Sequence, residues 1–227
     1  MSQAGLYAAA IILAYVIGAI PFGLILAKMT VKTDIRLIGS GKTGTTNVLR
    51  AAGKKVAAIS LVLDVGKGAA AVIFAGWITG DVTHFIPQAA AAGAAVLGHT
   101  WSVFLGFRGG RGVATFIGAI LPMYWPAAIL GGGMVIGLGV QSRYMSLGSI
   151  TGTVGAFFYM LAMNVLHVDF ILPPPPIAYV VYAMAGAIFI YVMHRDNISR
   201  LVNGTERKIG DKPATAAKPM PDSTVYK

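Results

Sequence analysis

The segment Ile38–Arg50, IGSGKTGTTNVLR, gathers residue types that bind anions, in a chain otherwise rich in alkyl side chains. Its glycines let the backbone turn N–H groups toward a ligand, and its hydroxyl groups add hydrogen-bond donors. Arg50 adds a guanidinium, whose planar fork matches the oxygens of a phosphate. A run of glycine, serine and threonine alone is more often a plain turn between helices. The interpretation as a phosphate-binding loop therefore depends on the rest of the chain.

The sequence Gly41-Lys42-Thr43 also looks like the end of a nucleotide-binding P-loop. That motif needs a glycine five residues before Gly41, where this chain has Arg36. A P-loop also follows a β-strand, whereas a long apolar segment of helical character precedes this loop. We therefore expect neither a nucleotide nor a nucleic acid as a partner.

Composition indicates a membrane protein. Hydrophobic residues make up 56% of the 227 residues and charged residues only 11%, against about 25% charged in soluble domains. Five apolar segments approach the roughly 20 residues that cross a bilayer as a helix. They are residues 6–27, 56–78, 85–107, 147–166 and 177–193. With no cysteine, the chain can form neither a disulfide nor a cysteine metal site. We expect an all-α integral membrane protein.

The distribution of basic residues predicts the topology. They concentrate in residues 28–55, residues 108–111, Arg143 and the tail from Arg195. The connections 79–84 and 167–176 contain no Lys or Arg. Since basic loops stay in the cytoplasm, both ends of the apolar segment 112–140 are cytoplasmic, and it must turn round near 124–126 as two short helices. The prediction is seven transmembrane helices, the fourth and fifth short, with the N-terminus outside and the C-terminus cytoplasmic.

Domain organisation follows from this count. We expect residues 1–210 to form a single membrane-embedded domain, because seven helices leave no room for a separate soluble one. The mixture of Lys, Pro and Ala in residues 211–227 is typical of a disordered cytoplasmic tail.

Four polar stretches then lie at cytoplasmic helix ends: residues 38–50, 98–115, 141–150 and 194–207. Neighbouring helix ends bring them together, so we expect one recessed site at the membrane interface. The second stretch repeats the chemistry of the first, because Arg108 and Arg111 flank two glycines and a third follows at Gly112. Membrane anchoring explains one basic residue near a helix end, but not two glycines between two arginines.

Several polar side chains support either a structural or a functional interpretation. His99 is equally well explained as a buried neutral histidine and as a general base, whereas His194 at a helix exit is the better base candidate. Ser146 and Ser149 share one helix face, and Ser146 could be a helix cap. Asp64 and Lys67 are also spaced i, i+3, and we expect them to pair inside the bundle because unpaired charges are costly there.

Together the four stretches resemble the bacterial acyl-phosphate glycerol-3-phosphate acyltransferases. The resemblance rests on GSGKTGTTNVLR, GHTWSVFLGFRGGRGVAT, SLGSI and HRDNISRLVNGTE, in this order, and extends to about Arg207. The family usually has Asn-Ile in place of Lys42-Thr43, proline in place of Ser102 and lysine in place of Arg111, which leaves the charge of the site intact. The resemblance implies a multi-pass protein of the bacterial inner membrane, with its active site at the cytoplasmic face.

The implied reaction transfers a fatty acyl group from acyl phosphate to the primary hydroxyl of glycerol 3-phosphate, giving lysophosphatidic acid. The implied partners are these two substrates and membrane lipids, with no cofactor and no metal. Such chemistry needs mainly phosphate binding, positioning and oxyanion stabilisation. The candidate catalytic residues are Ser40, Arg50, Arg111, Ser146, His194 and Asn197. The candidate substrate-binding residues are Gly39, Gly41, Thr46, Asn47, Lys67, His99, Arg108, Gly109, Gly110, Gly112 and Ser149.

Within this set, we expect Ser40 and Arg50 to hold one phosphate, and Arg111 and Asn197 to help hold the other. His194 or a substrate phosphate oxygen accepts the hydroxyl proton, and no covalent acyl-enzyme forms.

Two other functions fit parts of the pattern. An anion transporter could use the same basic mouth, but it typically has polar residues near the membrane midplane and paired repeats. A metal-dependent phosphotransferase acting on lipid alcohols would need clustered carboxylates for Mg²⁺. Asp34, Asp64 and Asp196 are too dispersed in the sequence to suggest such a cluster.

Overall fold

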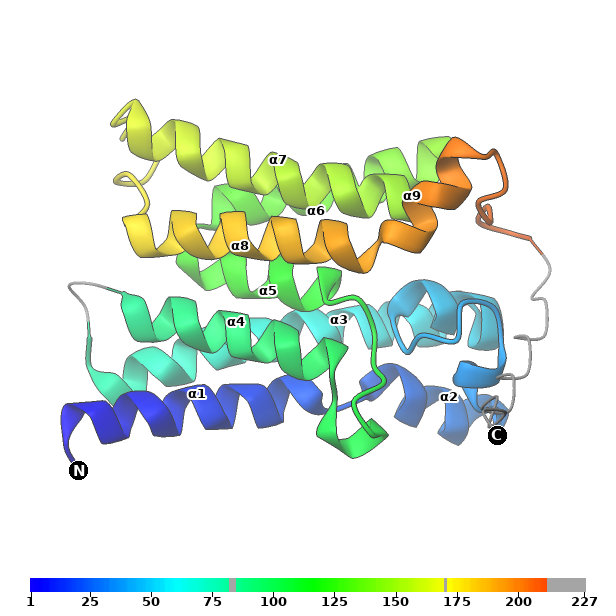
Figure 1. The fold of residues 1–227 in the computed structure, drawn as a ribbon, viewed down its shortest axis with the longest axis horizontal. Coiled ribbons are helices and arrows are strands. Elements are labelled where there is room, and N and C mark those ends of the chain that lie inside the picture. The colour runs from blue at the N-terminus through cyan, green and yellow to red at the C-terminus, as the bar shows by residue number, and fades with distance from the viewer. Residues whose placement is uncertain (82–84, 170, 212–227) are drawn as a thin grey trace, which may run out of the picture.

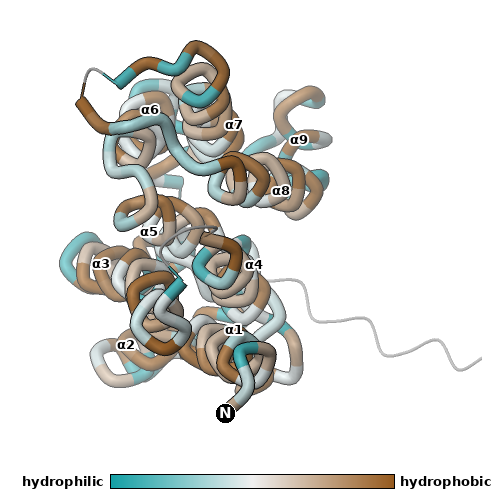
Figure 2. The backbone as a smooth tube through the Cα atoms, turned by 90° about the vertical axis from the view of Figure 1, so that its left-hand side faces the viewer, coloured by the Kyte–Doolittle hydropathy of each residue, from teal (hydrophilic) through white to brown (hydrophobic). Residues whose placement is uncertain are grey.

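The computed structural model describes residues 1–81, 85–169 and 171–211. All regular elements in these residues are helical, and the long helices run side by side (Figure 1). They are α1 (Gln3–Ala19), α2 (Phe22–Val31), η1 (Ile35–Leu37), α3 (Thr45–Thr79), α4 (Ile86–Thr100), η2 (Val103–Leu105), α5 (Val113–Met123), α6 (Trp125–Ser142), α7 (Met145–Val165), α8 (Ile177–Met193) and α9 (Arg195–Val202). Figure 2, a view along the bundle, shows α1–α4 in one group, α6–α9 in another and α5 between them.

Helix length and apolarity agree with a multi-pass membrane protein. Among the described residues, four stretches could cross a membrane on these criteria: Gln3–Val31, Thr45–Thr79, Trp125–Ser142 and Met145–Val165. A fifth is added if α8 and α9, which are bent by 59°, count as one span. Helices α4 and α5 are shorter, with 15 and 11 residues. The seven-span count and the orientation remain predictions.

The first apolar segment, 6–27, was expected as one helix but is broken at Ile20–Pro21. Proline lacks a backbone N–H and disturbs the preceding helical turn, so α1 ends at Ala19. Two side chains donate hydrogen bonds to the backbone carbonyls at this break. Ser102 Oγ donates to the Ala19 carbonyl at 2.6 Å, and Lys67 Nζ donates to the Ile20 carbonyl at 2.9 Å. The break therefore exposes backbone oxygens that α3 and the segment after α4 can bind.

The segment 112–140 is two helices, as predicted, with the break at Tyr124. Gly112 at the start of α5 and Met145 just after α6 line the same cavity, so the pair enters and leaves at one end of the bundle. Helix α5 is short, but α6 has 18 residues and is long enough to span, so the expectation of two short helices was wrong for the second.

Other boundaries also differ from the sequence expectation. Helix α3 begins at Thr45, eleven residues before the expected start, and is interrupted by non-helical geometry at Gly53. Helix α4 ends at Thr100, and the apolar residues after it form η2 and loops rather than a continued helix. Helix α8 has the predicted bounds, Ile177–Met193. Except for Asp211, the predicted disordered tail lies outside the described residues.

Small residues allow the helix backbones to approach closely, as is common in membranes. A Cβ atom at Gly18 of α1 would overlap the Ala95 backbone of α4, and one at Gly68 of α3 would overlap the Thr115 carbonyl of α5. The largest apolar cluster surrounds α5, with Phe116 stacked on Tyr182 of α8 at a ring-centroid distance of 5.4 Å. This packing fixes α5 between the two helix groups, where it forms one wall of the site.

Candidate active site

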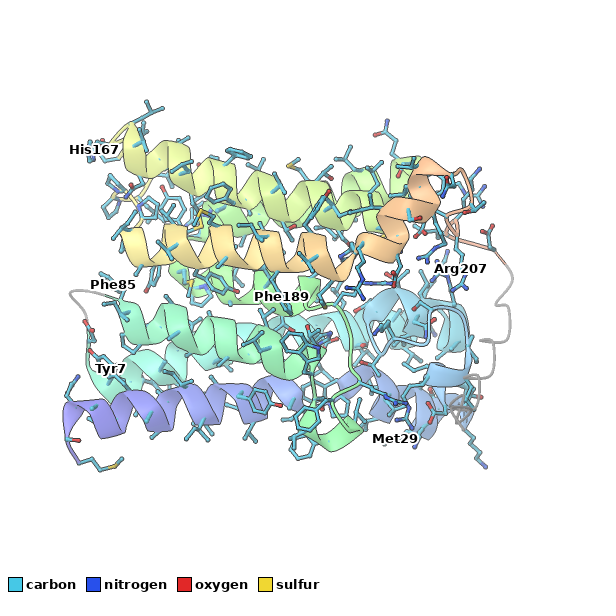
Figure 3. The ribbon with its side chains drawn as sticks, viewed as in Figure 1. Tyr7, Met29, Phe85, His167, Phe189 and Arg207 are labelled. Atoms are coloured by element: carbon cyan, nitrogen blue, oxygen red, sulfur yellow. The ribbon has the colours of Figure 1, made fainter. Side chains whose placement is uncertain are left out.

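A cavity of about 270 Å³ opens at the end of the bundle where α3, α5 and α7 begin. Each of the four polar stretches contributes to its lining, through residues such as Arg50, Arg111, Ser146 and His194. The prediction that these stretches meet is therefore confirmed. Figure 3 shows Arg207, another lining residue, at the end of the bundle opposite Tyr7, Phe85 and His167.

The cavity has a polar end and an apolar arm. In the part of the chain that the structure describes, the polar end carries five basic side chains, those of Lys42, Arg50, Arg111, Arg200 and Arg207. The apolar arm runs between α3, α5 and α6 and is lined by Leu61, Val65, Val113, Ile117, Val135 and Ile136. Ile136 is 53% exposed, so the arm reaches the outer apolar surface of the bundle. This shape fits a molecule with an anionic head and an alkyl chain.

The loop Ile38–Arg50 is organised by the side chain of Asn47. Its Nδ2 lies 2.7 Å from the Ile35 carbonyl, 3.0 Å from that of Ile38 and 2.9 Å from that of Lys42. Its Oδ1 accepts the Ser40 N–H at 3.3 Å. Because the amide is used in this way and is only 2% exposed, Asn47 holds the loop in shape. Gly39 and Gly41 adopt φ of +58° and +67°, which disfavour other residues.

The loop leads directly into the N-terminus of α3 at the cavity. The N-cap is Gly44, so no side chain caps this helix end. The Oγ1 atom of Thr45 is buried and has no hydrogen-bond partner among the described residues, and both Thr45 and Thr46 line the cavity. Free N–H groups and the helix dipole favour an anion at such an end. The substrate-binding candidates predicted from the sequence include Thr46 but not Thr45.

The second glycine-rich stretch separates its two arginines. Arg111 lines the cavity, and its Nε donates to the Met193 carbonyl at the end of α8 at 3.3 Å. Arg108 is exposed and does not line the cavity. Gly109 and Gly110 also lie outside the lining and pack against His99, whereas Gly112 caps α5 with φ of +81° and lines the cavity.

Mutual repulsion among the basic groups leaves the polar end ready for an anion. Burial lowers the pKa of Lys42, and the nearby Arg111 guanidinium lowers it further. Burial also lowers the pKa of Arg111, and Arg200 adds to this effect. A bound phosphate would relieve this repulsion, because an opposite charge favours the protonated form of each group.

His194 lies where α8 meets α9 and is 3% exposed. Its Nδ1 is 2.8 Å from the Ile190 carbonyl, so Nδ1 carries a proton and Nε2 is left as the acceptor. Burial, reinforced by the Arg111 charge, lowers the pKa of His194 to about 4. The imidazole is therefore neutral at physiological pH and can accept a hydrogen bond in the cavity.

Glu206 is the main residue that sequence reasoning missed. Its Oε1 accepts hydrogen bonds from Ser146 Oγ at 2.9 Å and Asn197 Nδ2 at 2.6 Å, and its Oε2 accepts from Arg200 Nε at 2.7 Å. Asn197 Oδ1 is buried without a hydrogen-bond partner among the described residues. Ser146 therefore does not cap α7, which begins after Tyr144. The available sequence signal was weak, because Glu206 is one of two carboxylates, with Asp196, among the arginines of residues 194–207.

Below the polar end, Asp64 and Lys67 form the predicted buried ion pair at 2.8 Å. His99 Nδ1 lies 3.5 Å from the same Asp64 oxygen, and both His99 and Asp64 line the cavity. Lys67 does not line it, because its ammonium group is directed to Asp64 and to the Ile20 carbonyl.

The candidate residues thus divide by position. Those that line the cavity are Ser40, Thr46, Asn47, Arg50, His99, Arg111, Gly112, Ser146, Ser149, His194 and Asn197. Those that do not are Gly39, Gly41, Lys67, Arg108, Gly109 and Gly110. The second group contributes backbone shape and packing around the site, apart from the exposed Arg108.

Known proteins with a similar sequence are glycerol-3-phosphate acyltransferases. The family described as glycerol-3-phosphate acyltransferase matches residues 8–204. Glycerol-3-phosphate acyltransferase 3 of Dehalococcoides mccartyi (strain CBDB1) is 46% identical over 212 residues, which cover 89% of this chain and 95% of the relative. The glycerol-3-phosphate acyltransferase of Caulobacter vibrioides (strain NA1000 / CB15N) is 41% identical over 215 residues, covering 94% of this chain and 93% of the relative.

The fold is similar to crystal structures of PlsY (YgiH), an integral membrane glycerol 3-phosphate acyltransferase. The glycerol 3-phosphate form has a TM-score of 0.79 and 34% identity, and the match covers 90% of this chain and 96% of that one. The lysophosphatidic acid form has a TM-score of 0.77 and 33% identity, with coverage of 90% and 95%. Because sequence and fold match over nearly the whole length of these proteins, the chain belongs to the glycerol-3-phosphate acyltransferase family.

Proposed function

We propose that this acyltransferase takes its acyl group from acyl phosphate and transfers it to the primary hydroxyl of glycerol 3-phosphate. The observation that carries the proposal is the cavity with a basic polar end and an apolar arm. Arg200 is paired with Glu206, but the remaining four basic side chains still exceed the need of one phosphate, whereas the two substrates together bring two phosphates and one alkyl chain. The crystallised PlsY forms contain glycerol 3-phosphate and lysophosphatidic acid, an acceptor and a product of this reaction.

Two groups of residues bind the two phosphates. Ser40 and Arg50 hold one, supported by the uncapped N-terminus of α3 at Thr45. Arg111 and Asn197 hold the other, with the buried Asn197 Oδ1 available to a substrate hydroxyl. The acyl chain lies in the apolar arm between α3 and α6. This arrangement aligns the acceptor hydroxyl and the acyl carbonyl in one small volume, which supplies most of the catalysis.

The reaction itself is a direct displacement at the acyl carbon. The acceptor oxygen forms the new ester bond, the bond from the acyl carbon to the phosphate oxygen breaks, and inorganic phosphate leaves. Because the pKa of His194 is lowered to about 4, its imidazole is a weaker base than a phosphate, whose second pKa is about 6. The phosphate oxygen therefore takes the hydroxyl proton, and His194 Nε2 orients the hydroxyl by accepting its hydrogen bond.

The proposed topology places the cavity at the cytoplasmic face of the bacterial inner membrane. Basic loops gather at the cavity end of the bundle, as the positive-inside rule predicts for the cytoplasmic side. The absence of native cysteine allows a direct test with single cysteines at exposed positions, Asp169→Cys at the far end and Lys55→Cys near the cavity. A membrane-impermeant maleimide should label the first in intact spheroplasts and the second only after permeabilisation. The reverse pattern contradicts the topology.

The decisive test of function uses purified protein in lipid with labelled glycerol 3-phosphate and one acyl donor at a time. Synthetic acyl phosphate should give lysophosphatidic acid, whereas acyl-CoA and the acyl thioester of acyl carrier protein should not. Product from acyl-CoA alone would leave the family assignment intact but refute the proposed donor. Activity should survive EDTA, because no step uses a metal, and an acyl-serine trapped by mass spectrometry would refute direct displacement.

A further inference from the structure

Gly109 and Gly110 raise a question that backbone geometry does not answer. Neither has a positive φ, so a residue with a side chain could adopt the same backbone conformation. Both are buried, and neither lines the cavity. The need for glycine must therefore come from what lies against them.

His99 occupies the space next to both glycines. A Cβ atom at Gly110 would overlap Nε2 of the His99 imidazole, and one at Gly109 would overlap the His99 carbonyl oxygen. The backbone is paired along the same contact. Gly110 N–H donates to the His99 carbonyl at 3.1 Å, and Gly109 N–H donates to the Thr100 carbonyl at 3.0 Å. The glycine pair thus rests directly on the end of α4.

The opposite side of the imidazole is held by α3. His99 Nδ1 lies 3.5 Å from Asp64 Oδ1, which is 2.8 Å from Lys67 Nζ. Lys67 in turn donates to the Ile20 carbonyl at the break between α1 and α2, at 2.9 Å. All three side chains are at most 6% exposed. The ring is therefore fixed between Asp64 and Gly110.

The residue after Gly110 is Arg111, the basic group of this stretch that lines the cavity. Its Nε contacts the Met193 carbonyl at 3.3 Å, which leaves the rest of the guanidinium for a ligand. We propose that His99 is a positioning residue: its imidazole, held by Asp64, is the surface against which Gly110 packs and thereby sets the position of Arg111. This inference rests on the proposed role of Arg111 in phosphate binding.

A double-mutant cycle between His99 and Gly110 tests the contact. Gly110→Ala places a methyl group against the imidazole and should displace Arg111. His99→Ala removes the obstructing ring, so adding Gly110→Ala to it should cost little. We expect Gly110→Ala to raise the KM of one substrate about tenfold in the wild-type background and less than about twofold in the His99→Ala background, a coupling within the range measured for residues in contact.

Gly109→Ala is the matched control. Its methyl group collides with the His99 carbonyl, which alanine at position 99 retains. Its effect should therefore be the same in both backgrounds. Arg111→Gln supplies a second reference, because displacement of Arg111 should raise the KM of the same substrate that Arg111→Gln affects, with a smaller change in kcat.

If a variant turns over too slowly for kinetics, the coupling between His99 and Gly110 is measured from the thermal unfolding of the same variants in lipid. The contact is supported if His99→Ala reduces the loss of thermal stability caused by Gly110→Ala but not the loss caused by Gly109→Ala. Additive effects in both measurements, or a KM change in the substrate unaffected by Arg111→Gln, overturn the inference. Failure of the proposed function is a separate result, because then the wild-type protein itself makes no product from acyl phosphate.

Discussion

The two glycine-rich stretches have similar compositions but are shaped by different forces. In residues 38–50, Gly39 and Gly41 adopt positive φ, and Asn47 ties the loop to itself through backbone carbonyls. In the second stretch, Gly109 and Gly110 have no positive φ and pack on His99 of α4.

The first loop is therefore shaped by contacts within itself, whereas the second rests on His99, whose imidazole is held in turn by Asp64 of α3. A change inside the first loop should act through that loop alone. A change in the second should be sensitive to α1, α3 and α4, which support His99.

The two loops should be equal in one respect, the need for a cation. Replacing Arg50 or Arg111 with alanine should lower kcat/KM at least about thousandfold, because each removes charge from a phosphate in a site shielded from water. Acyl transfer from acyl phosphate in lipid measures the loss. Arg108→Ala is the neighbouring control and should retain activity, since Arg108 is exposed and outside the cavity. An active Arg50→Ala enzyme contradicts the phosphate assignment.

Asn47→Ala tests the local organisation of the first loop. It removes the four hydrogen bonds of the Asn47 amide, those to the carbonyls of Ile35, Ile38 and Lys42 and the one from the Ser40 N–H, so the free energy of unfolding should fall by about 3 to 5 kcal/mol. Thermal or denaturant unfolding in detergent measures this change. Thr46→Ala changes a neighbour that also lines the cavity but should cost less than about 1 kcal/mol. Equal stability of Asn47→Ala and the wild-type protein would show that the loop is held from outside.

His194, beside Arg111, gives the site a pH dependence. Its pKa is lowered to about 4 from 6.5, so between these values the unfolded chain binds a proton that the folded protein does not. Stability therefore falls as pH drops through this window, by about 1.4 kcal/mol per unit and about 3 kcal/mol in all. Unfolding free energies measured from pH 7 to 4 should show this slope. His194→Gln should flatten it, and the exposed His167→Gln should not.

Ser102 tests how far the second stretch depends on the break in α1. Ser102→Ala removes the bond to the Ala19 carbonyl and should cost about 1 kcal/mol of unfolding free energy. Ser102→Pro loses the same bond, but Ser102 already has the φ of −67° that proline imposes. The gain of roughly 0.4 to 1 kcal/mol from a stiffer unfolded chain should offset much of the loss. A larger cost for proline than for alanine would contradict this balance.

Features encoded by local sequence were predictable. Proline precedes α8 and polar residues follow it, so its bounds were correct, and the pairing of Asp64 with Lys67 followed from the cost of unpaired charge. The four polar stretches identified the cavity because residues such as Arg50 and Arg111 have few roles in an apolar chain other than binding anions or anchoring.

Features that depend on tertiary contacts were not predictable. Glu206 follows α9 and looks like part of a solvated tail until Ser146 and Asn197 are brought to it from two other helices. The break at Ile20–Pro21 was hidden because the side chains that donate to its carbonyls lie 47 and 83 residues away in the sequence. The role of Asn47 depends on loop carbonyls whose direction the sequence does not specify.

The apolar arm that opens beside Ile136 has a kinetic consequence. On the proposed reaction, the donor chain need never leave the bilayer, whereas glycerol 3-phosphate arrives from water. The rate should then follow the mole fraction of acyl phosphate in the lipid phase rather than its amount per volume of solution. Adding inert lipid at constant total donor would slow the enzyme, so the membrane acts as a two-dimensional solvent for one substrate and a boundary for the other.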